Sequence, residues 1–478
     1  MIHKTVYLLI FLFPHFLHAQ FDKSYIAVPI LDTIPINVYT KLTQRLEEDK
    51  THVKGYSRKI NNYIKHLYEE RFEYVVSNFN NDYLIDDPII TPYLQQIQEK
   101  IYKANPTLSK ETTVYVYRSS VPNAFSFGDG NLAITLGLLS RLQNESQLAF
   151  ILCHELAHYH RRHADMQITT LARLNYDKEL EKQLERNTTY NYKKELIKNL
   201  ELSINQHSRT YEFEADSIGL TYFLNTNYDL SAPVECMDIL GKADKGFNQT
   251  SIDFKKYFDF AEYPFKTTWL AYEKSTTWDR NEKEDTFDDS DITHTHPNCQ
   301  RRQAALKRQL QGKTNRQSAK SNETKFQHIT TLSTFEEIAS NYHFKEYGVA
   351  LFSTLLLLEK YPENTYLHAM VSQCIYQLYM YQKNHEIGKV LDLPDSRFAD
   401  NYDRFLTFFQ QLRLSEIASI GYQYAESRKT KDATSEDFWY AYWLCSQLPA
   451  SKTTPTKIKA EYVGIFPTGK YIASMRQQ

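Results

Sequence analysis

Apolar residues recur at helical spacing along most of the chain, and two short segments break that pattern. Residues 20–88 mix polar and aromatic side chains at helical spacing, and residues 90–105 (ITPYLQQIQEKIYKAN) form a clearer amphipathic stripe. TTVYVYRS (112–119) alternates β-branched and aromatic residues, which predicts a strand, and NLAITLG (131–137) predicts a second one. Between them, SVPNAFSFGDG (120–130) is rich in turn-forming residues. The pattern predicts a mainly α fold with a small β-sheet.

Further helices are expected after the predicted strands. Asn144 and Gln147 have the spacing of an N-terminal capping box, which satisfies backbone N–H groups that the first helical turn leaves free. We expect the helix that they open to run through LAFILCHELAHYHRRH to residue 163. Long charged helices continue to about residue 205, and another helix carries RTYEFEADSIGLTYFL (209–224).

The second half of the chain contains two polar breaks and then more helices. Residues 279–291 (DRNEKEDTFDDSD) are acidic and nearly free of apolar side chains, which predicts a mobile loop. Residues 312–324 (GKTNRQSAKSNET) predict a linker. Beyond it, residues 346–379 show two apolar-striped helices around a YPEN turn, which resembles a tetratricopeptide helical pair. EIAS recurs only at Glu337 and Glu416, and this spacing does not fit the repeat period, so true repeats stay an open question.

Composition and charge narrow the classes of function. The chain has 478 residues and a formal net charge of −2. No overall basic field attracts phosphates, so nucleic acid is not an expected partner. The five cysteines show no CxxC spacing, and we expect small core residues rather than a disulfide framework or a thiolate metal cluster.

The N-terminus resembles a secretory signal. MIHKTVYLLIFLFPHFLHAQ places a lysine before an apolar run from Val6 to Leu17, and Ala19 follows as the expected cleavage position. The run contains Pro14 and is shorter than the roughly 20 apolar residues of a membrane span, so an uncleaved anchor is the weaker alternative. We therefore expect a soluble extracytoplasmic protein, periplasmic or secreted, with peripheral membrane contact at most.

The stretch CHELAHYHRRH (153–163) raises the question of a metal site. Side chains four residues apart share one face of a helix, so His154 and His158 can bind one ion. Glu155 lies one step round the helix, within reach of a water molecule on that ion. Two neutral imidazoles and a carboxylate base are the chemistry of the HExxH zinc motif. An exposed basic helix end is the alternative, but the apolar run LAFIL indicates a buried helix.

Two further histidines are not expected to bind the metal. His160 and His163 lie off the shared face of the helix and are predicted to be exposed. The longer motif HExxHxxGxxH is also absent, because Arg161 replaces its glycine and Ala164 its last histidine. A third ligand must therefore come from elsewhere.

The segment YEFEAD offers that ligand. Glu212 and Asp216 are four residues apart and share one helix face, whereas Glu214 points nearly opposite. One carboxylate can complete a His₂Glu site and leave a position for water, while the other can accept the spare ring N–H of a ligand histidine. A solvated acidic helix face is the alternative, which the HExxH motif upstream disfavours.

Taken together, these motifs resemble zinc metallopeptidase family forty-eight, which includes HtpX and the type I CAAX prenyl protease. Four pieces occur in the family's order over roughly residues 88–310, namely PNAFSFGDGNLAITLGLL, HELAH, RTYEFEAD and THTHPNCQRR. The resemblance implies that His154, His158 and Glu212 bind one Zn²⁺ ion per chain. It further implies that Glu155 is the general base and that Asp216 supports the ligands.

The same resemblance implies three residues near the substrate. His296 is expected to hydrogen-bond the substrate carbonyl or the developing oxyanion, with His294 as a nearby rival for that role. Arg302 stands at the position of the arginine of that HP element, and Asn123 matches the NAF element beside the substrate path. A turn residue after Pro122 is an equally good interpretation of Asn123.

The chain lacks the intramembrane helices of the membrane members and resembles the soluble periplasmic branch typified by BepA. The expected fold is an α+β zincin (gluzincin) domain followed by an α-helical, tetratricopeptide-like domain. The predicted ranges are a signal peptide (1–19), an N-terminal helical segment (20–87), the metallopeptidase domain (88–311), a linker (312–325), a helical C-terminal domain (326–450) and a tail (451–478).

The expected function is a zinc metalloendopeptidase acting in protein quality control on extended or misfolded envelope proteins. We expect the substrate to add as a strand along NLAITLG. The alternative is a metal-containing chaperone or scaffold whose C-terminal helices bind envelope protein complexes with little proteolysis. An exopeptidase is a weaker option, because no cluster for a terminal amine or carboxylate stands out.

Overall fold

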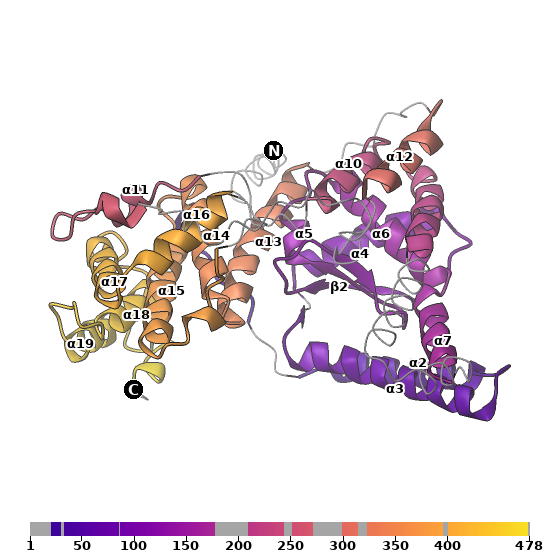
Figure 1. Ribbon diagram of the computed structural model, residues 1–478, viewed down its shortest axis with the longest axis horizontal. Coiled ribbons are helices and arrows are strands. Elements are labelled where there is room, and N and C mark those ends of the chain that lie inside the picture. Colours follow the sequence, from indigo (N-terminus) through magenta and orange to yellow (C-terminus); the bar gives the residue numbers. More distant parts are fainter. Residues whose placement is uncertain are drawn as a thin grey trace, which may run out of the picture. The chain divides into compact units, whose positions relative to one another are not determined.

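The chain forms two compact units, which are described separately (Figure 1). The sheet unit takes its residues from 28–244 and 281–334, and the helical unit from 1–27, 245–280 and 335–478. The computed structural model describes residues 21–29, 33–85, 87–176, 209–242, 251–270, 299–313, 323–394 and 400–476.

A four-stranded mixed sheet forms the centre of the sheet unit. Its strands, in the spatial order β1-β2-β4-β3, are β1 (Leu84–Ile85), β2 (Thr113–Tyr117), β3 (Ala124–Ser126) and β4 (Asn131–Thr135). β2 and β4 run parallel, with Val114 opposite Leu132, and β1 and β3 pair antiparallel on either side. The sequence pattern predicts β2 and β4 but not β3, which lies in the turn-rich stretch.

The strand order shows that the prediction of a substrate pairing along NLAITLG is wrong. NLAITLG contains β4, and β4 is hydrogen-bonded to β2 on one side and to β3 on the other. All five residues of β4 are buried. β1 and β3 each have a neighbour on one side only within the described residues, so they form the two edges of the sheet, and β3 is the edge next to β4.

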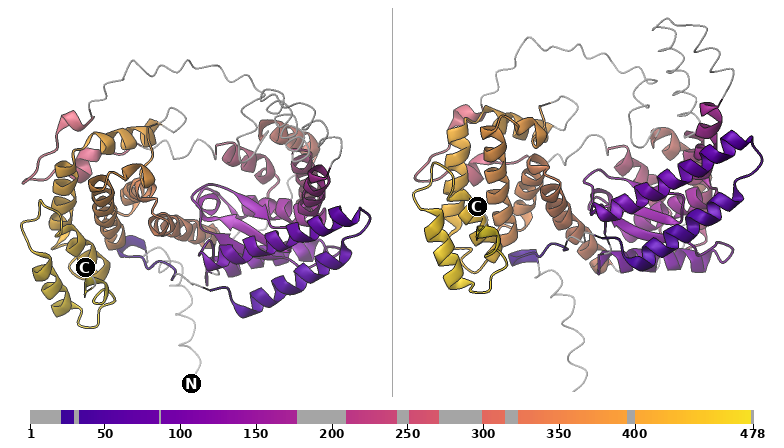
Figure 2. Two further views of the ribbon diagram at one scale, coloured as in Figure 1. Left: turned by 60° about the horizontal axis from the view of Figure 1, so that its bottom comes forward. Right: turned by 90° about the horizontal axis from the view of Figure 1, so that it is seen from below.

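Helices cover both faces of this sheet (Figure 2). Val75 of α3 packs with Tyr115 of β2 in an apolar cluster on one face, and α4 contacts β2 from the other face, where Val114 points. The labelled helices of the sheet unit are α2 (Ile36–His52), α3 (Arg58–Asn80), α4 (Ile90–Ala104), α5 (Leu136–Leu139), α6 (Glu145–His160), α7 (His163–Asn175), α10 (Ala232–Leu240) and α12 (Cys299–Leu310). Residues 209–224 form a further helix, and α13 (Glu323–His343) crosses the division between the units.

The start of α6 confirms the predicted cap. The Asn144 side chain accepts a hydrogen bond from the backbone N–H of Gln147 at 3.0 Å. The Gln147 side chain reaches back to the backbone N–H of Gln143 at 2.8 Å, one residue before the cap itself. Of the 16 residues of α6, only His158 and His160 are not buried. The HExxH motif therefore sits on a core helix, as the LAFIL run predicts.

The helix of residues 209–224 lies against α6 at Gly219. A Cβ atom on Gly219 would lie 2.9 Å from the Cα atom of His154 and 3.0 Å from its backbone nitrogen. Only glycine permits an approach this close without a shift of the backbone. Glu212 and Asp216 share a helix face with Gly219, so the contact also brings their carboxylates to α6.

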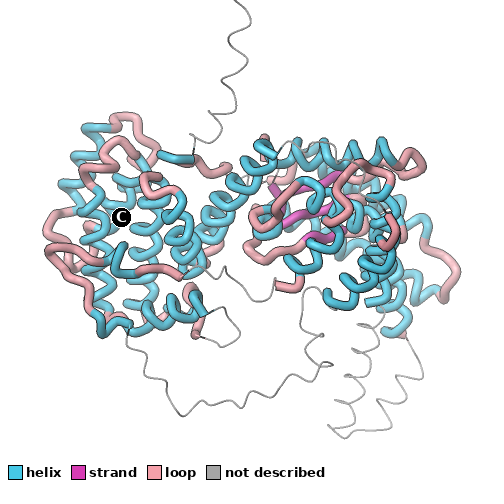
Figure 3. Tube along the Cα trace, turned by 90° about the horizontal axis from the view of Figure 1, so that it is seen from above, coloured by secondary structure: helices cyan, strands magenta, loops and turns pink. Residues whose placement is uncertain are grey.

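The described residues of the helical unit form α-helices and short 3₁₀ helices. Figure 3 shows strands only in the sheet unit. Its elements are α11 (Phe254–Phe258), η2 (Thr267–Leu270), α14 (Tyr347–Lys360), α15 (Thr365–Lys383), η5 (Ile387–Lys389), α16 (Asp400–Gln411), α17 (Leu414–Arg428), α18 (Glu436–Cys445), α19 (Pro455–Ile465) and η6 (Ser474–Arg476). α11 belongs here although it precedes α12 in sequence, because Phe254 stacks on Phe408 with 4.5 Å between ring centroids. η2 is held likewise, since Trp269 donates a hydrogen bond to Glu416 at 3.0 Å.

The predicted mainly α fold with a small sheet is confirmed. All five cysteines are buried and free, as predicted. No helix among the described residues has both the length and the apolar character needed to cross a membrane. The predicted signal peptide, the acidic loop and most of the linker lie outside the described residues, so those predictions stay untested.

Replacing Gly219 with alanine is expected to lower the free energy of unfolding of the sheet unit by about 1–3 kcal/mol, because the added methyl group overlaps the backbone of α6. Thermal unfolding followed by circular dichroism measures the change. Gly464→Ala is the matched control, since nothing lies within 4 Å of its missing Cβ. An unfolding transition in Gly219→Ala that matches the wild type would contradict the close helix contact.

Candidate metal centre

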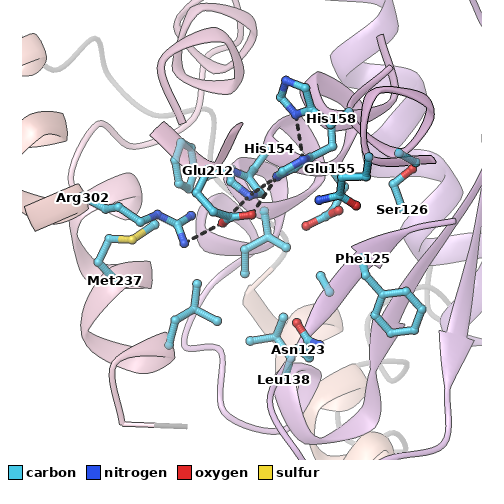
Figure 4. Close-up of a pocket in the computed structure, with 17 residues that line it drawn as sticks. Asn123, Phe125, Ser126, Leu138, His154, Glu155, His158, Glu212, Met237 and Arg302 are labelled. Carbon is cyan, nitrogen blue, oxygen red and sulfur yellow. Dashed lines mark hydrogen bonds and ion pairs between the residues drawn. The ribbon is translucent and has the colours of Figure 1, made fainter. Parts of the chain in front are cut away.

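His154 and His158 of α6 and Glu212 of the helix of residues 209–224 bring their ligand atoms together (Figure 4). The two Nε2 atoms lie 3.0 Å apart, and Glu212 oxygens lie 3.5 Å from His154 Nε2 and 3.3 Å from His158 Nε2. Tetrahedral ligands at about 2.0–2.2 Å from one zinc ion are about 3.3–3.6 Å from each other. The three side chains therefore fit a single metal ion of this kind.

Asp216 and Arg302 contact two of these ligands, His154 and Glu212, on the sides that face away from the metal position. Asp216 Oδ1 lies 3.0 Å from His154 Nδ1, which leaves His154 Nε2 directed at the other ligands. Arg302 of α12 is 1% exposed and donates hydrogen bonds to both oxygens of Asp216, at 2.7 and 2.9 Å. Its third nitrogen, Nη1, lies 2.8 Å from Glu212 Oε2. One buried guanidinium thus fixes both carboxylates.

These charges shift the pKa values of the ligands. Burial alone would raise the pKa of Glu212, but Arg302 and the two imidazoles lower it well below the ordinary value. Burial also lowers the pKa of His154, yet Asp216 and Glu212 outweigh it and raise the pKa to about 10. Glu212 is therefore an anion at neutral pH, and a cation that binds His154 must displace its proton.

His163 is buried, with 2% of its surface exposed, so the prediction that it is exposed is wrong. That prediction continues one helix to residue 163, whereas α6 ends at His160 and Arg162 adopts a left-handed conformation (φ 58°) before α7 begins. The turn directs His163 back to the site. His163 Nδ1 lies 2.9 Å from His158 Nδ1, and its Nε2 lies 3.3 Å from Glu214. His160 is half-buried rather than exposed.

These contacts define which nitrogen of His158 faces the metal. A carboxylate only accepts hydrogen bonds, so Nε2 of His163 carries its proton and donates to Glu214. Burial and the nearby His158 lower the pKa of His163 to about 4, so His163 is neutral at pH 7 and its Nδ1 accepts from His158 Nδ1–H. His158 then presents the lone pair of Nε2 to the metal. Glu214, which lies off the ligand face, acts through His163.

Glu155 lines the same cavity as the three ligands (Figure 4). The cavity has a volume of about 270 Å³. Glu155 is buried, and burial raises the pKa of its carboxyl group against the opposing effect of His154 and His158. Asn123 immediately precedes β3 and lines the cavity, and Arg302 lines it as well. His296 and His294 lie outside the described residues, and the role of His296 stays a prediction.

The domain is mainly helical, with a small mixed sheet, and it combines an HExxH helix with a glutamate from a second helix. This combination of fold and site defines the metallopeptidase class. The sequence profile of Peptidase family M48 matches residues 88–310, so this part of the chain is similar to that family.

Curated relatives match the chain over a shorter stretch. The chain is 30% identical over 80 residues to the beta-barrel assembly-enhancing protease of Escherichia coli (strain K12) and 31% identical over 80 residues to that of Yersinia pestis, in each case 17% of this chain and 16% of the relative. It is 31% identical over 94 residues to a Vibrio cholerae protein that carries the same name provisionally, 20% of this chain and 19% of that protein. The chain thus spans about a fifth or less of the length of these relatives. These matches confirm the predicted family and its BepA-like branch.

His163→Leu is expected to weaken the binding of Zn²⁺ about 10–100-fold, because leucine removes the acceptor that fixes the ring of His158. His163→Gln retains an acceptor oxygen and is expected to recover most of the affinity. Competition with a coloured chelator measures the affinity, and thermal unfolding without metal checks that both variants fold. Equal affinity in wild type and His163→Leu would contradict this role of His163.

Proposed function

We propose that the chain is a zinc-dependent metalloendopeptidase that hydrolyses peptide bonds of extended or misfolded envelope proteins. The observation that carries the proposal is the convergence of His154, His158 and Glu212 beside Glu155 in one cavity. A zinc ion held by these residues would supply a Lewis acid and lower the pKa of a water molecule to about 7. Among the described residues the cluster has three ligands, which agrees with the open position that a hydrolytic site needs.

Glu155 is the proposed general base. Its carboxylate removes a proton from the attacking water while the water oxygen bonds to the scissile carbonyl carbon, and it delivers that proton to the leaving amine as the C–N bond breaks. His296 is the proposed donor to the negative charge that develops on the carbonyl oxygen. Asp216, Arg302 and His163 keep the ligand side chains oriented throughout the reaction.

The substrate backbone is proposed to pair with β3. Phe127 N–H donates to Asn131 at 3.0 Å, and hydrogen-bonded pairs alternate along an antiparallel ladder, so Phe125 bonds to Ala133 while the N–H and C=O groups of Ala124 and Ser126 point outward. Both outward residues line the metal cavity. Main-chain pairing of this kind selects extended segments with little dependence on sequence.

The proposed setting is the cell envelope. The signal-like N-terminus favours export, to the periplasm or beyond, and the names of the relatives concern beta-barrel assembly. The helical unit is a proposed contact surface for envelope protein complexes, with peripheral membrane contact at most and no nucleic acid partner. The separate helical unit also favours a second candidate, a chaperone or scaffold in which the metal site has little proteolytic activity.

Glu155→Gln is expected to lower the rate of casein cleavage by about 10²–10⁴-fold while one equivalent of zinc stays bound, because glutamine keeps the shape of the side chain but cannot accept the proton. Cleavage is followed with labelled casein, and zinc is measured by elemental analysis. Glu99→Gln, which changes an exposed carboxylate of α4, is the matched control and should match the wild type.

Full activity in Glu155→Gln would contradict the role of Glu155 as general base. A wild-type protein that binds zinc, cleaves no unfolded substrate and still suppresses aggregation would support the chaperone or scaffold instead. Loss of cleavage on chelation, with recovery on zinc addition, supports the hydrolase.

A further inference from the structure

A second, wider cavity continues the metal cavity along β3. It has a volume of about 710 Å³ and lies between α3, α7 and the β3 edge of the sheet. The two cavities have five lining residues in common, which are Asn123, Phe125, Ser126, Ala164 and Gln167. The two cavities therefore adjoin along β3, and the part of this groove between α3 and α7 is called the apolar arm below.

Large apolar side chains line the apolar arm and remain open to solvent. Tyr74 of α3 is 56% exposed, Val121 is 46% exposed and Leu171 of α7 is 45% exposed. Leu67 and Ile168 line it as well and are half-buried. Exposed apolar surface of this kind, gathered along a concave site, is typical of a binding surface.

The charged residues of the apolar arm do not favour an anionic ligand. Arg71 lines it, but its guanidinium donates to Asp49 and, at 3.2 Å, to Asp165. Glu70, on the neighbouring position of α3, adds a negative charge. A phosphate or an acidic peptide would thus meet an arginine that is already paired with two carboxylates, and the negative charge of Glu70. An apolar side chain, in contrast, would bury apolar surface on both partners.

We infer that the apolar arm binds large aliphatic and aromatic side chains of the polypeptide whose backbone pairs with β3. This inference rests on the proposed function, since continuity with the metal cavity identifies the occupant as substrate. Alternate side chains of an extended segment point to the same side and lie about 7 Å apart, so two of them can enter one groove. The favoured substrates are therefore strand-like segments in which large apolar residues alternate with polar ones.

The test uses two fluorescent peptides of equal length and identical residues at the cleaved bond. One carries Leu or Phe at alternate positions on both sides of that bond, and the other carries Gln there. Binding to the zinc-loaded Glu155→Gln protein is followed by fluorescence anisotropy, and KM is measured with the wild type. We expect at least about tenfold tighter binding of the apolar peptide, the scale that burial of one large side chain provides.

Leu171→Glu and Val121→Glu, each made in the Glu155→Gln background, are expected to reduce that preference to less than about threefold, because each places a carboxylate in the apolar arm. Ile89→Glu is the matched control, because Ile89 is 41% exposed and does not line the groove. Thermal unfolding verifies that all variants fold, and the two arm variants provide independent readings.

Equal binding of the two peptides, or an unchanged preference in both arm variants, would overturn the assignment of the apolar arm. The outcomes separate it from the proposed function. Cleavage of both peptides with equal KM would support the peptidase and contradict the binding role of the apolar arm. Preferential binding of the apolar peptide without any cleavage by the wild type would contradict the peptidase and support the binding role of the apolar arm.

Discussion

The contact between α6 and the helix of residues 209–224 is the constraint on which the candidate site depends. Two of the three ligands lie on the first helix and the third on the second, so their distance from each other is set by how closely the helices pack. Gly219 permits that approach beside the backbone of His154. Arg302 then holds Glu212 and Asp216 in the low dielectric of the core, where loss of the guanidinium would leave both buried carboxylates without this cation.

Both ligand histidines are oriented through Nδ1, but by different partners. His154 reaches Asp216 and then Arg302 of α12, whereas His158 reaches His163 of α7 and then Glu214. Each route occupies Nδ1 and leaves Nε2 for the metal. The ligand side chains are therefore oriented before an ion arrives, although the proton on His154 must leave when the ion binds, and this orientation depends on segments that are far apart in the sequence.

The sequence predicts the core of this arrangement because it follows from local geometry. The spacing of HELAH and of Glu212 and Asp216 places side chains on single helix faces, and the structure brings those faces together. His163 could not be predicted in the same way. A single residue in a left-handed conformation, Arg162, ends the helical period and redirects the chain, and helical spacing carries no signal for that event.

The remaining differences also have physical causes. β3 has three residues, which are too few for an alternating pattern to stand out within a turn-rich stretch. Residues 251–270 pack in the helical unit through aromatic contacts to α16 and a hydrogen bond to α17. Such contacts between distant segments leave no periodic trace in the sequence.

The most direct test of this account is a crystal structure of the zinc-loaded protein with anomalous diffraction recorded at the zinc edge. The account predicts one strong peak, about 2.0–2.2 Å from Nε2 of His154, Nε2 of His158 and a carboxylate oxygen of Glu212. A zinc ion bound elsewhere, or one for which Glu212 is not a ligand, would contradict it.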